Sequence, residues 1–106
     1  MTMKTEGFAI TSGRGFHITF PNGVTVSVQF GGGQYCEHYY GEIGSEPAHH
    51  KWSSTDAEVA AWDKNGEWIT KRWRRGGDNV VGYQSPSDVL ALLKWAASRK
   101  EKKESE

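Results

Sequence analysis

Two stretches of alternating apolar and polar residues flank Pro21-Asn22-Gly23, and together they constrain the fold more than any other feature of the chain. Residues 16–20 read FHITF and residues 24–30 read VTVSVQF. Alternate residues of a strand point to opposite faces, so each stretch has one apolar face and one polar face. The pattern predicts an antiparallel β-hairpin with one apolar face and one hydroxyl-rich face.

The length of the hairpin loop follows from the same alternation, because directly opposed residues of a hairpin lie on the same face. A two-residue Asn-Gly loop would place Phe20 opposite Thr25 and mix the two faces. A three-residue loop places Phe20 opposite Val24 and Ile18 opposite Val26. Proline suits the first position of a type I turn and glycine suits the left-handed position that follows. We therefore expect the three-residue loop.

A second Asn-Gly turn, in the sequence DKNG, separates two further stretches, residues 56–62 and 67–73. A three-residue loop here places Trp62 opposite Trp68, a favourable cross-strand pair. A two-residue loop would instead oppose a lysine and a glutamate. We favour the register that pairs the tryptophans, and we expect a second hairpin.

The last part of the chain has the signals of a capped helix. Ser85 suits the N-cap, Pro86 suits the first helical position, and Asp88 completes a capping box. Apolar residues then follow at helical spacing. This apolar stripe consists of Val89, Leu90, Leu92, Leu93, Ala96 and Ala97.

Short strands are also expected at residues 7–11 and 80–83. The predicted fold is α+β: a meandering antiparallel sheet of two hairpins plus short strands, with one C-terminal helix packed on one face. Residues 1–98 are expected to form a single domain, and residues 99–106 a charged flexible tail.

Length and composition narrow the class of protein. The chain has 106 residues, 36% of them hydrophobic, which predicts one domain with a lean core. Thirteen basic residues balance 13 acidic ones, which argues against a globally basic nucleic-acid binder. A single cysteine excludes an internal disulfide. With no segment expected to span a membrane or direct secretion, we expect a soluble cytoplasmic protein.

Five tryptophans compensate for the small hydrophobic share, since each buried aromatic ring removes a large area from water. In a domain this small, we expect most of them to lie in the core. The five are Trp52, Trp62, Trp68, Trp73 and Trp95.

Residues 31–55 show no clear periodicity, and a loop this long in a small domain is usually functional. It begins with three glycines after a strand, as phosphate-binding loops do, but no lysine-serine or lysine-threonine pair follows, which argues against a nucleotide-binding P-loop. The glycines either bend the chain or allow close approach to a ligand. Tyrosines suit adaptable contact surfaces, which makes this loop a candidate binding edge. The residues concerned are Gly31, Gly32, Gly33, Tyr35, Tyr39 and Tyr40.

The same loop holds the only cysteine, Cys36, with His38, His49 and His50. Four such residues could ligate zinc, but their spacing matches no known zinc finger. Cys36 and His38 could also form a nucleophile pair, although neither a lowered thiol pKa nor an oxyanion hole is evident from the sequence. A small buried thiol is the commoner outcome. We predict no metal and no cofactor.

Four basic residues surround a tryptophan in the sequence KRWRR. Arginine binds phosphate through two parallel hydrogen bonds, and tryptophan can stack on a base, so this stretch favours a nucleotide or nucleic-acid partner. Alternatively, the stretch is a solvated strand end in which Arg72 lies opposite Glu58. The residues are Lys71, Arg72, Trp73, Arg74 and Arg75.

Three segments together resemble a family of short uncharacterised proteins of tailed phages and prophages. They read GFHITFPNGVTVSVQFGGGQYCEH, TDAEVAAWDKNGEWI and VVGYQSPSDVLALL. The resemblance offers no catalytic motif. It implies a small accessory protein, of a kind that often acts as an inhibitor, sponge or adaptor against host defence, in the cytoplasm of a bacterial host.

These observations lead to one main expectation and two alternatives. The main one is a non-enzymatic binding protein that sequesters a nucleotide second messenger or caps a host defence protein, as an assembly of two or more copies. One alternative is a nucleic-acid binder that uses the KRWRR strand, and the other is an enzyme using Cys36 with a histidine. The expected ligand-binding residues are Gly31, Gly32, Gly33, Tyr35, Tyr39, Tyr40, Arg72, Trp73, Arg74 and Arg75.

Overall fold

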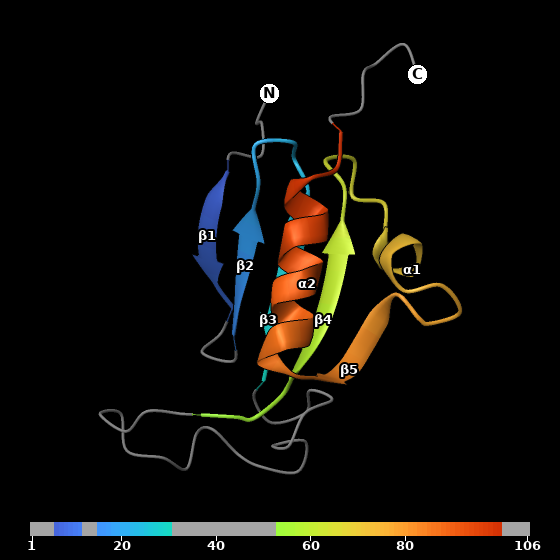
Figure 1. Ribbon diagram of the computed structural model, residues 1–106. Helices are drawn as coiled ribbons and strands as arrows, with labels where there is room; N and C mark the ends of the chain where they lie inside the picture. Colours follow the sequence, from blue (N-terminus) through green and yellow to red (C-terminus); the bar gives the residue numbers. More distant parts are fainter. Residues whose placement is uncertain (1–5, 12–14, 31–52, 101–106) are drawn as a thin grey trace.

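The computed structural model describes residues 6–11, 15–30 and 53–100. In this part of the chain, five antiparallel strands form one sheet in the order β1-β2-β3-β4-β5, which confirms the predicted α+β meander. Figure 1 shows α2 lying along one face of the sheet. The elements are β1 (Gly7–Ile10), β2 (Gly15–Thr19), β3 (Thr25–Gln29), β4 (Ala57–Trp62), α1 (Thr70–Trp73), β5 (Val80–Gln84) and α2 (Pro86–Ala97).

The β2–β3 hairpin has the predicted three-residue loop. Ile18 lies opposite Val26, as the alternation requires. The Phe20 N–H donates to the Val24 carbonyl at 2.9 Å, and the Gly23 N–H donates to the Phe20 carbonyl at 2.8 Å. Gly23 has φ +85°, a conformation that is open to glycine and strained for other residues.

The second hairpin begins as predicted but does not continue. Trp62 and Trp68 lie opposite each other, with ring centroids 5.5 Å apart in an edge-to-face arrangement. The chain then leaves the sheet, so the prediction of a strand through residue 73 was wrong. The hydroxyl of buried Thr70 accepts from the Ala61 N–H at 2.9 Å and donates to the Ala61 carbonyl at 3.2 Å. The Thr70 hydroxyl thereby makes the hydrogen bonds with Ala61 that the backbone of a neighbouring strand would otherwise make. The backbone itself continues into α1.

The predicted opposition of Glu58 and Arg72 was wrong for the same reason. Glu58 lies opposite Gln29 of β3. Arg72 is exposed on α1, the single helical turn that replaces the expected strand. The KRWRR sequence is therefore a helical turn and its exit from the helix, and not a strand end.

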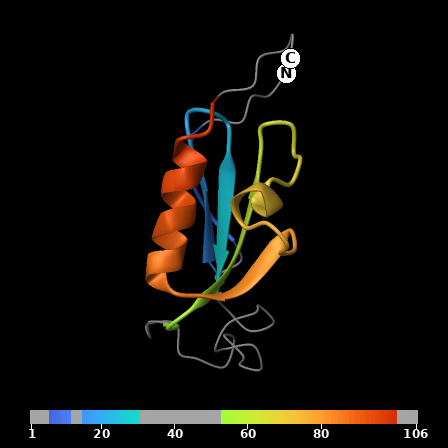
Figure 2. The same ribbon diagram turned by 45° about the vertical axis from the view of Figure 1, so that its right-hand side comes forward.

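The core lies between α2 and the apolar face of the sheet, as Figure 2 shows from the side. Leu92 and Ala96 of α2 are completely buried, together with Val26 and Ala61 of the sheet. The predicted apolar stripe is confirmed at its centre and wrong at its margins, because Leu90 and Ala97 are exposed.

The tryptophans divide between the core and the surface. Trp73 and Trp95 pack against the core as expected. Trp68 is 49% exposed, so the expectation of a core position was wrong for this residue. Trp62 is half-buried on the polar face of the sheet, in edge contact with His17 at 5.0 Å between ring centroids. Trp52 lies outside the described residues.

A β-bulge in β5 changes which side chains point toward α2. Val81 lies opposite Val59, whereas Gln84 lies opposite Ala57, so β5 has one more residue than β4 between these pairs. Tyr83 sits at the bulge with φ +55°, the one non-glycine residue in the described chain with a positive φ. As a result, Gln84 is buried and Tyr83 is exposed.

Both ends of α2 are capped. At its start, the Asp88 N–H donates to the Ser85 hydroxyl and the Ser85 N–H donates to the Asp88 carboxylate, which confirms the capping box. At its end, the Asn22 side-chain amide donates to the Ala96 carbonyl at 2.8 Å and to the Arg99 carbonyl at 2.7 Å. The turn of the first hairpin therefore closes the last turn of the helix.

No helix in residues 6–11, 15–30 or 53–100 is long and apolar enough to cross a membrane.

We predict that Asn22→Ala lowers the free energy of unfolding by about 1 to 2 kcal/mol, because the Ala96 and Arg99 carbonyls and the Val24 N–H each lose a partner. Urea denaturation measures this loss. Asn65 is the matched control, since it occupies the same position before a left-handed glycine in the second turn but is exposed. An equal loss for Asn65→Ala would contradict a role of Asn22 as the helix cap.

Candidate functional site

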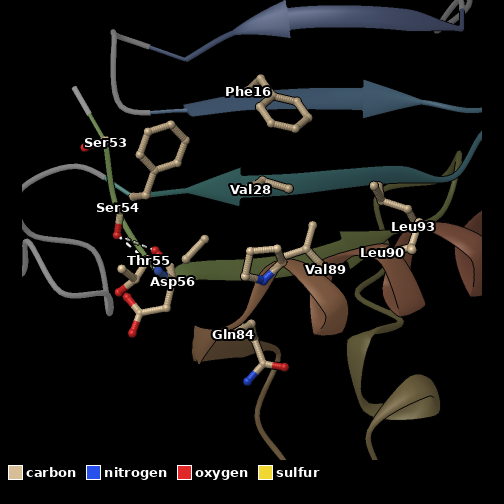
Figure 3. A pocket seen from close by; sticks show the side chains of 13 residues that line it. Phe16, Val28, Ser53, Ser54, Thr55, Asp56, Gln84, Val89, Leu90 and Leu93 are labelled. Carbon is tan, nitrogen blue, oxygen red and sulfur yellow. Dashed lines mark hydrogen bonds between the residues drawn. The ribbon is translucent and has the colours of Figure 1, made fainter. Parts of the chain in front are cut away.

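A pocket of 420 Å³ lies at the N-terminal end of α2, between the helix and the apolar face of β2 and β3. Its volume falls within the range of small-ligand sites. Its walls combine Phe16 of β2 and Phe30, which follows β3, with three apolar side chains of the helix. The helix residues are Val89, Leu90 and Leu93. Figure 3 labels Phe16 and the three helix residues.

The segment before β4 gives this apolar pocket a polar rim. Ser53, Ser54, Thr55 and Asp56 line one side of it, next to one another in Figure 3. The Ser54 hydroxyl donates to the Asp56 carbonyl and accepts from the Asp56 N–H at 3.3 Å, which holds the segment in a tight turn. The rim supplies hydroxyl groups and one carboxylate beside an aromatic surface.

Gln84 connects the pocket to the KRWRR sequence of α1 and its exit, which we call the basic helical turn. Its side chain contributes to the pocket wall and is 7% exposed. The Arg74 Nη2 atom donates to Gln84 Oε1 at 2.9 Å, and Gln84 Nε2 donates to the Gly82 carbonyl at 3.0 Å. The guanidinium of Arg74 also lies 4.6 Å from the centre of the Trp73 ring. The positively charged guanidinium of Arg74 is thus held next to Gln84, a residue of the pocket wall.

The N-terminus of α2 is less suited to an anion than an uncapped helix would be. Proline at the first position has no N–H, and the Asp88 N–H is taken by the Ser85 hydroxyl. Hydrogen bonds from the Ser85 backbone and side chain, with the positive charge of Arg74, lower the pKa of Asp88 below its usual 3.8. A carboxylate therefore occupies the helix start, which disfavours the binding of an anion there.

Of the predicted ligand-binding residues, four are described. Arg72, Arg74 and Arg75 are exposed on and after α1. Trp73 is half-buried, packs against the core and carries Arg74 over its ring, so it does not offer an open surface for stacking. The structure thus keeps the three arginines as candidates and removes Trp73 as a stacking platform.

The other predicted residues lie outside the described part of the chain. These are Gly31, Gly32, Gly33, Tyr35, Tyr39 and Tyr40, together with Cys36, His38, His49 and His50. Within residues 6–11, 15–30 and 53–100, no three His, Cys, Asp or Glu side chains are grouped as a metal site would require.

The polar face of the sheet carries a network of hydroxyl and amide groups. Gln29 Nε2 donates to the Thr11 hydroxyl at 2.7 Å and to the Ser27 hydroxyl at 3.1 Å. The hydroxyls of Thr19 and Thr25 share a hydrogen bond of 2.8 Å across the hairpin. These groups largely satisfy one another, so the network stabilises the β2–β3 face of the sheet and is a weaker candidate site than the pocket.

Sequence reasoning missed the pocket, although it identified most of the elements that form it. Phe16 and Phe30 were assigned to the apolar face, and Leu90 and Leu93 to the helix stripe. The one local signal was the polar cluster SSTD directly before a strand. Its approach to the start of α2 depends on tertiary structure and cannot be read from spacing.

No protein-family model matches the sequence, and no curated protein or solved structure is significantly similar to it.

We predict that Asp88→Asn reduces the dependence of stability on acid pH. The pKa of Asp88 is lowered on folding, so its contribution is complete above the unfolded pKa and is lost as pH falls through the folded pKa. Urea midpoints at pH 5 and at pH 3 should therefore differ less in the variant than in the natural protein. Asp78→Asn removes a carboxylate outside the cap and controls for the change in net charge. An undiminished difference in Asp88→Asn would contradict this account.

Proposed function

We propose that this chain is a small non-enzymatic binding protein that sequesters a nucleotide-like signal of host antiviral defence. The observation that carries the proposal is the pocket at the start of α2, where aromatic walls meet a polar rim and a fixed arginine. The defence context comes from the resemblance of the sequence to small proteins of tailed phages. Capping of a host defence protein is the other form that this role could take.

The chemistry of the pocket suits one nucleoside unit of such a ligand. The faces of Phe16 and Phe30 provide apolar and aromatic contact for a base. Carboxylate and hydroxyl groups, such as those of Asp56 and Ser54, are the partners that ribose hydroxyls use in nucleotide-binding proteins.

In this proposal, arginine side chains bind the phosphate of the ligand. Arg74 is held beside the pocket by its hydrogen bond to Gln84, and Arg72 and Arg75 are exposed on the same turn. A guanidinium can make two parallel charge-assisted hydrogen bonds to one phosphate. The base would enter the pocket, and the phosphate would remain at the surface near α1.

Isothermal titration calorimetry with mononucleotides, cyclic dinucleotides and ADP-ribose-type compounds tests the proposal. We expect one class to bind, and we expect Arg74→Gln and Asp56→Asn each to weaken binding at least about tenfold, which corresponds to 1.4 kcal/mol. Lys94→Gln and Asp78→Asn are matched controls, because neither residue lines the pocket or contacts Gln84. The proposal fails if no compound binds, or if the pocket variants bind as well as the controls.

Nucleic-acid binding by the basic helical turn is a second candidate, favoured by the exposure of the residues around it. Lys71, Arg72 and Arg75 are exposed, with no ion-pair partner among the described residues. Trp68, which is half exposed, immediately precedes the turn and could stack on an unpaired base.

For this second candidate, we expect binding to single-stranded DNA or RNA that weakens steeply between 50 and 200 mM salt, as counterion release requires. Replacing Lys71 and Arg72 with glutamine should reduce both the affinity and the salt dependence in a fluorescence-anisotropy titration. A double variant of Lys94 and Lys100, which are exposed on and after α2, controls for loss of charge. Equal effects of the two double variants would rule out a specific role for the basic turn.

A further inference from the structure

The apolar face of the sheet extends beyond the part that α2 covers. Phe8 lies opposite Ile18, and Ile10 lies opposite Phe16, so all four side chains point to the helix side. Figure 1 shows α2 lying over β3 and β4, with β1 and β2 uncovered beside it. Phe8 is 81% exposed and Ile10 is 85% exposed.

The helix contributes to the same uncovered surface. Leu90 is 53% exposed and borders the pocket together with Phe16 of β2. Among the described residues, the most exposed large apolar side chains on this side of the sheet are therefore Phe8, Ile10 and Leu90. We call the surface formed by Phe8, Ile10, Phe16, Ile18, Leu90 and Leu93 the open apolar face.

We propose that the open apolar face is the interface of a symmetric homodimer, in which two copies pack face to face. A two-fold interface must be complementary to itself. The open apolar face meets this condition, because none of its six side chains is polar or charged. The chain has no net charge at neutral pH, so overall electrostatic repulsion between two copies is small.

The dimensions of the fold suit a second copy. Packed sheets lie about 10 Å apart, and a helix with its side chains is about 10 Å in diameter. The sheet of a second copy therefore fits in the layer beside α2, over β1 and β2. This arrangement places Leu90 of each copy against Phe8 and Ile10 of the other.

The area is sufficient for a weak but specific dimer. At roughly 150 to 200 Å² for a full side chain, Phe8, Ile10 and Leu90 expose on the order of 400 Å² in each copy. Two copies together would bury roughly 800 Å² from these residues alone. The half-buried members of the face and the surrounding backbone bring the total toward about 1,200 Å², the lower limit of standard interfaces.

The proposed interface overlaps the pocket in part. Phe16, Leu90 and Leu93 line the pocket as well as belonging to the open apolar face, whereas Phe8 and Ile10 do not line it. Substitutions at Phe8 and Ile10 therefore test the dimer alone, and those at Asp56 and Arg74 test the ligand alone.

Sedimentation equilibrium of the full chain up to about 1 mM tests the proposal. We expect a monomer–dimer equilibrium in which Phe8→Glu and Ile10→Glu each raise the dissociation constant at least about tenfold. Far-UV circular dichroism should be unchanged, since both side chains are already exposed. Tyr83→Glu is the control, because Tyr83 is an exposed aromatic residue on β5, away from this face. A monomer at every concentration overturns the proposal, as does a dimer that both glutamate variants leave intact.

A second measurement does not rely on substitutions. In a mixture of isotopically labelled and unlabelled chains, filtered nuclear Overhauser spectra should show contacts between the Leu90 methyl groups of one copy and the Phe8 ring of the other. A dimer that lacks these contacts would exclude the face-to-face arrangement.

Discussion

The side-chain amide of Asn22 joins the turn of the first hairpin to the end of α2, 74 residues later in the chain. Its oxygen accepts from the Val24 N–H at 2.9 Å and so shapes the first hairpin turn, while its nitrogen donates to the carbonyl of Ala96 in α2 and to that of Arg99 just after the helix. The position of the helix end is thereby tied to one end of β3. A helix of 12 residues is about 18 Å long, close to the length of the strands beneath it. Fixing the C-terminal end of α2 therefore places its N-terminal end near the opposite ends of the strands, where the pocket forms.

The basic helical turn depends on a different interaction, in which a side-chain hydroxyl takes the place of strand backbone groups. Thr70 uses its hydroxyl in place of a strand backbone to satisfy Ala61, and this frees the following residues to coil. Trp73 can then reach the core, and Arg74 can reach Gln84 at the wall of the pocket. Had the strand continued, alternate basic residues would have pointed to opposite faces of the sheet. The helical turn instead brings Arg74 to the start of α2 and leaves Lys71, Arg72 and Arg75 in solvent.

Local patterns were sufficient to predict most of the fold. The hairpin register follows from alternation and turn chemistry, and the capping box follows from three residues, Ser85, Pro86 and Asp88. The errors occurred where a tertiary contact replaced a local preference. Nothing in the sequence around Thr70 indicates that its hydroxyl will complete the edge of β4. Leu90 continues the helical stripe, but it lies at the border of the pocket and is exposed there.

The candidate site was less predictable than the fold, because it is assembled from segments that are distant in sequence. Arg74 was identified from the basic KRWRR sequence, whereas Asp56 and Gln84 were not identified at all. Gln84 owes its place to the β-bulge, which moves it onto the face where Tyr83 would otherwise lie.

The bulge at Tyr83 is the place in β5 where the chain could be shortened without changing the site. Removing one of the two residues between Val81 and Gln84 would restore regular alternation and leave Gln84 opposite Ala57, on the face toward α2. The helix begins immediately afterwards, so this deletion would leave the N-cap in place. A deletion between Gln84 and Asp88 would instead break the capping box. A chain that shares this architecture is thus better identified by the spacing from Gln84 to Asp88 than by the number of residues in β5.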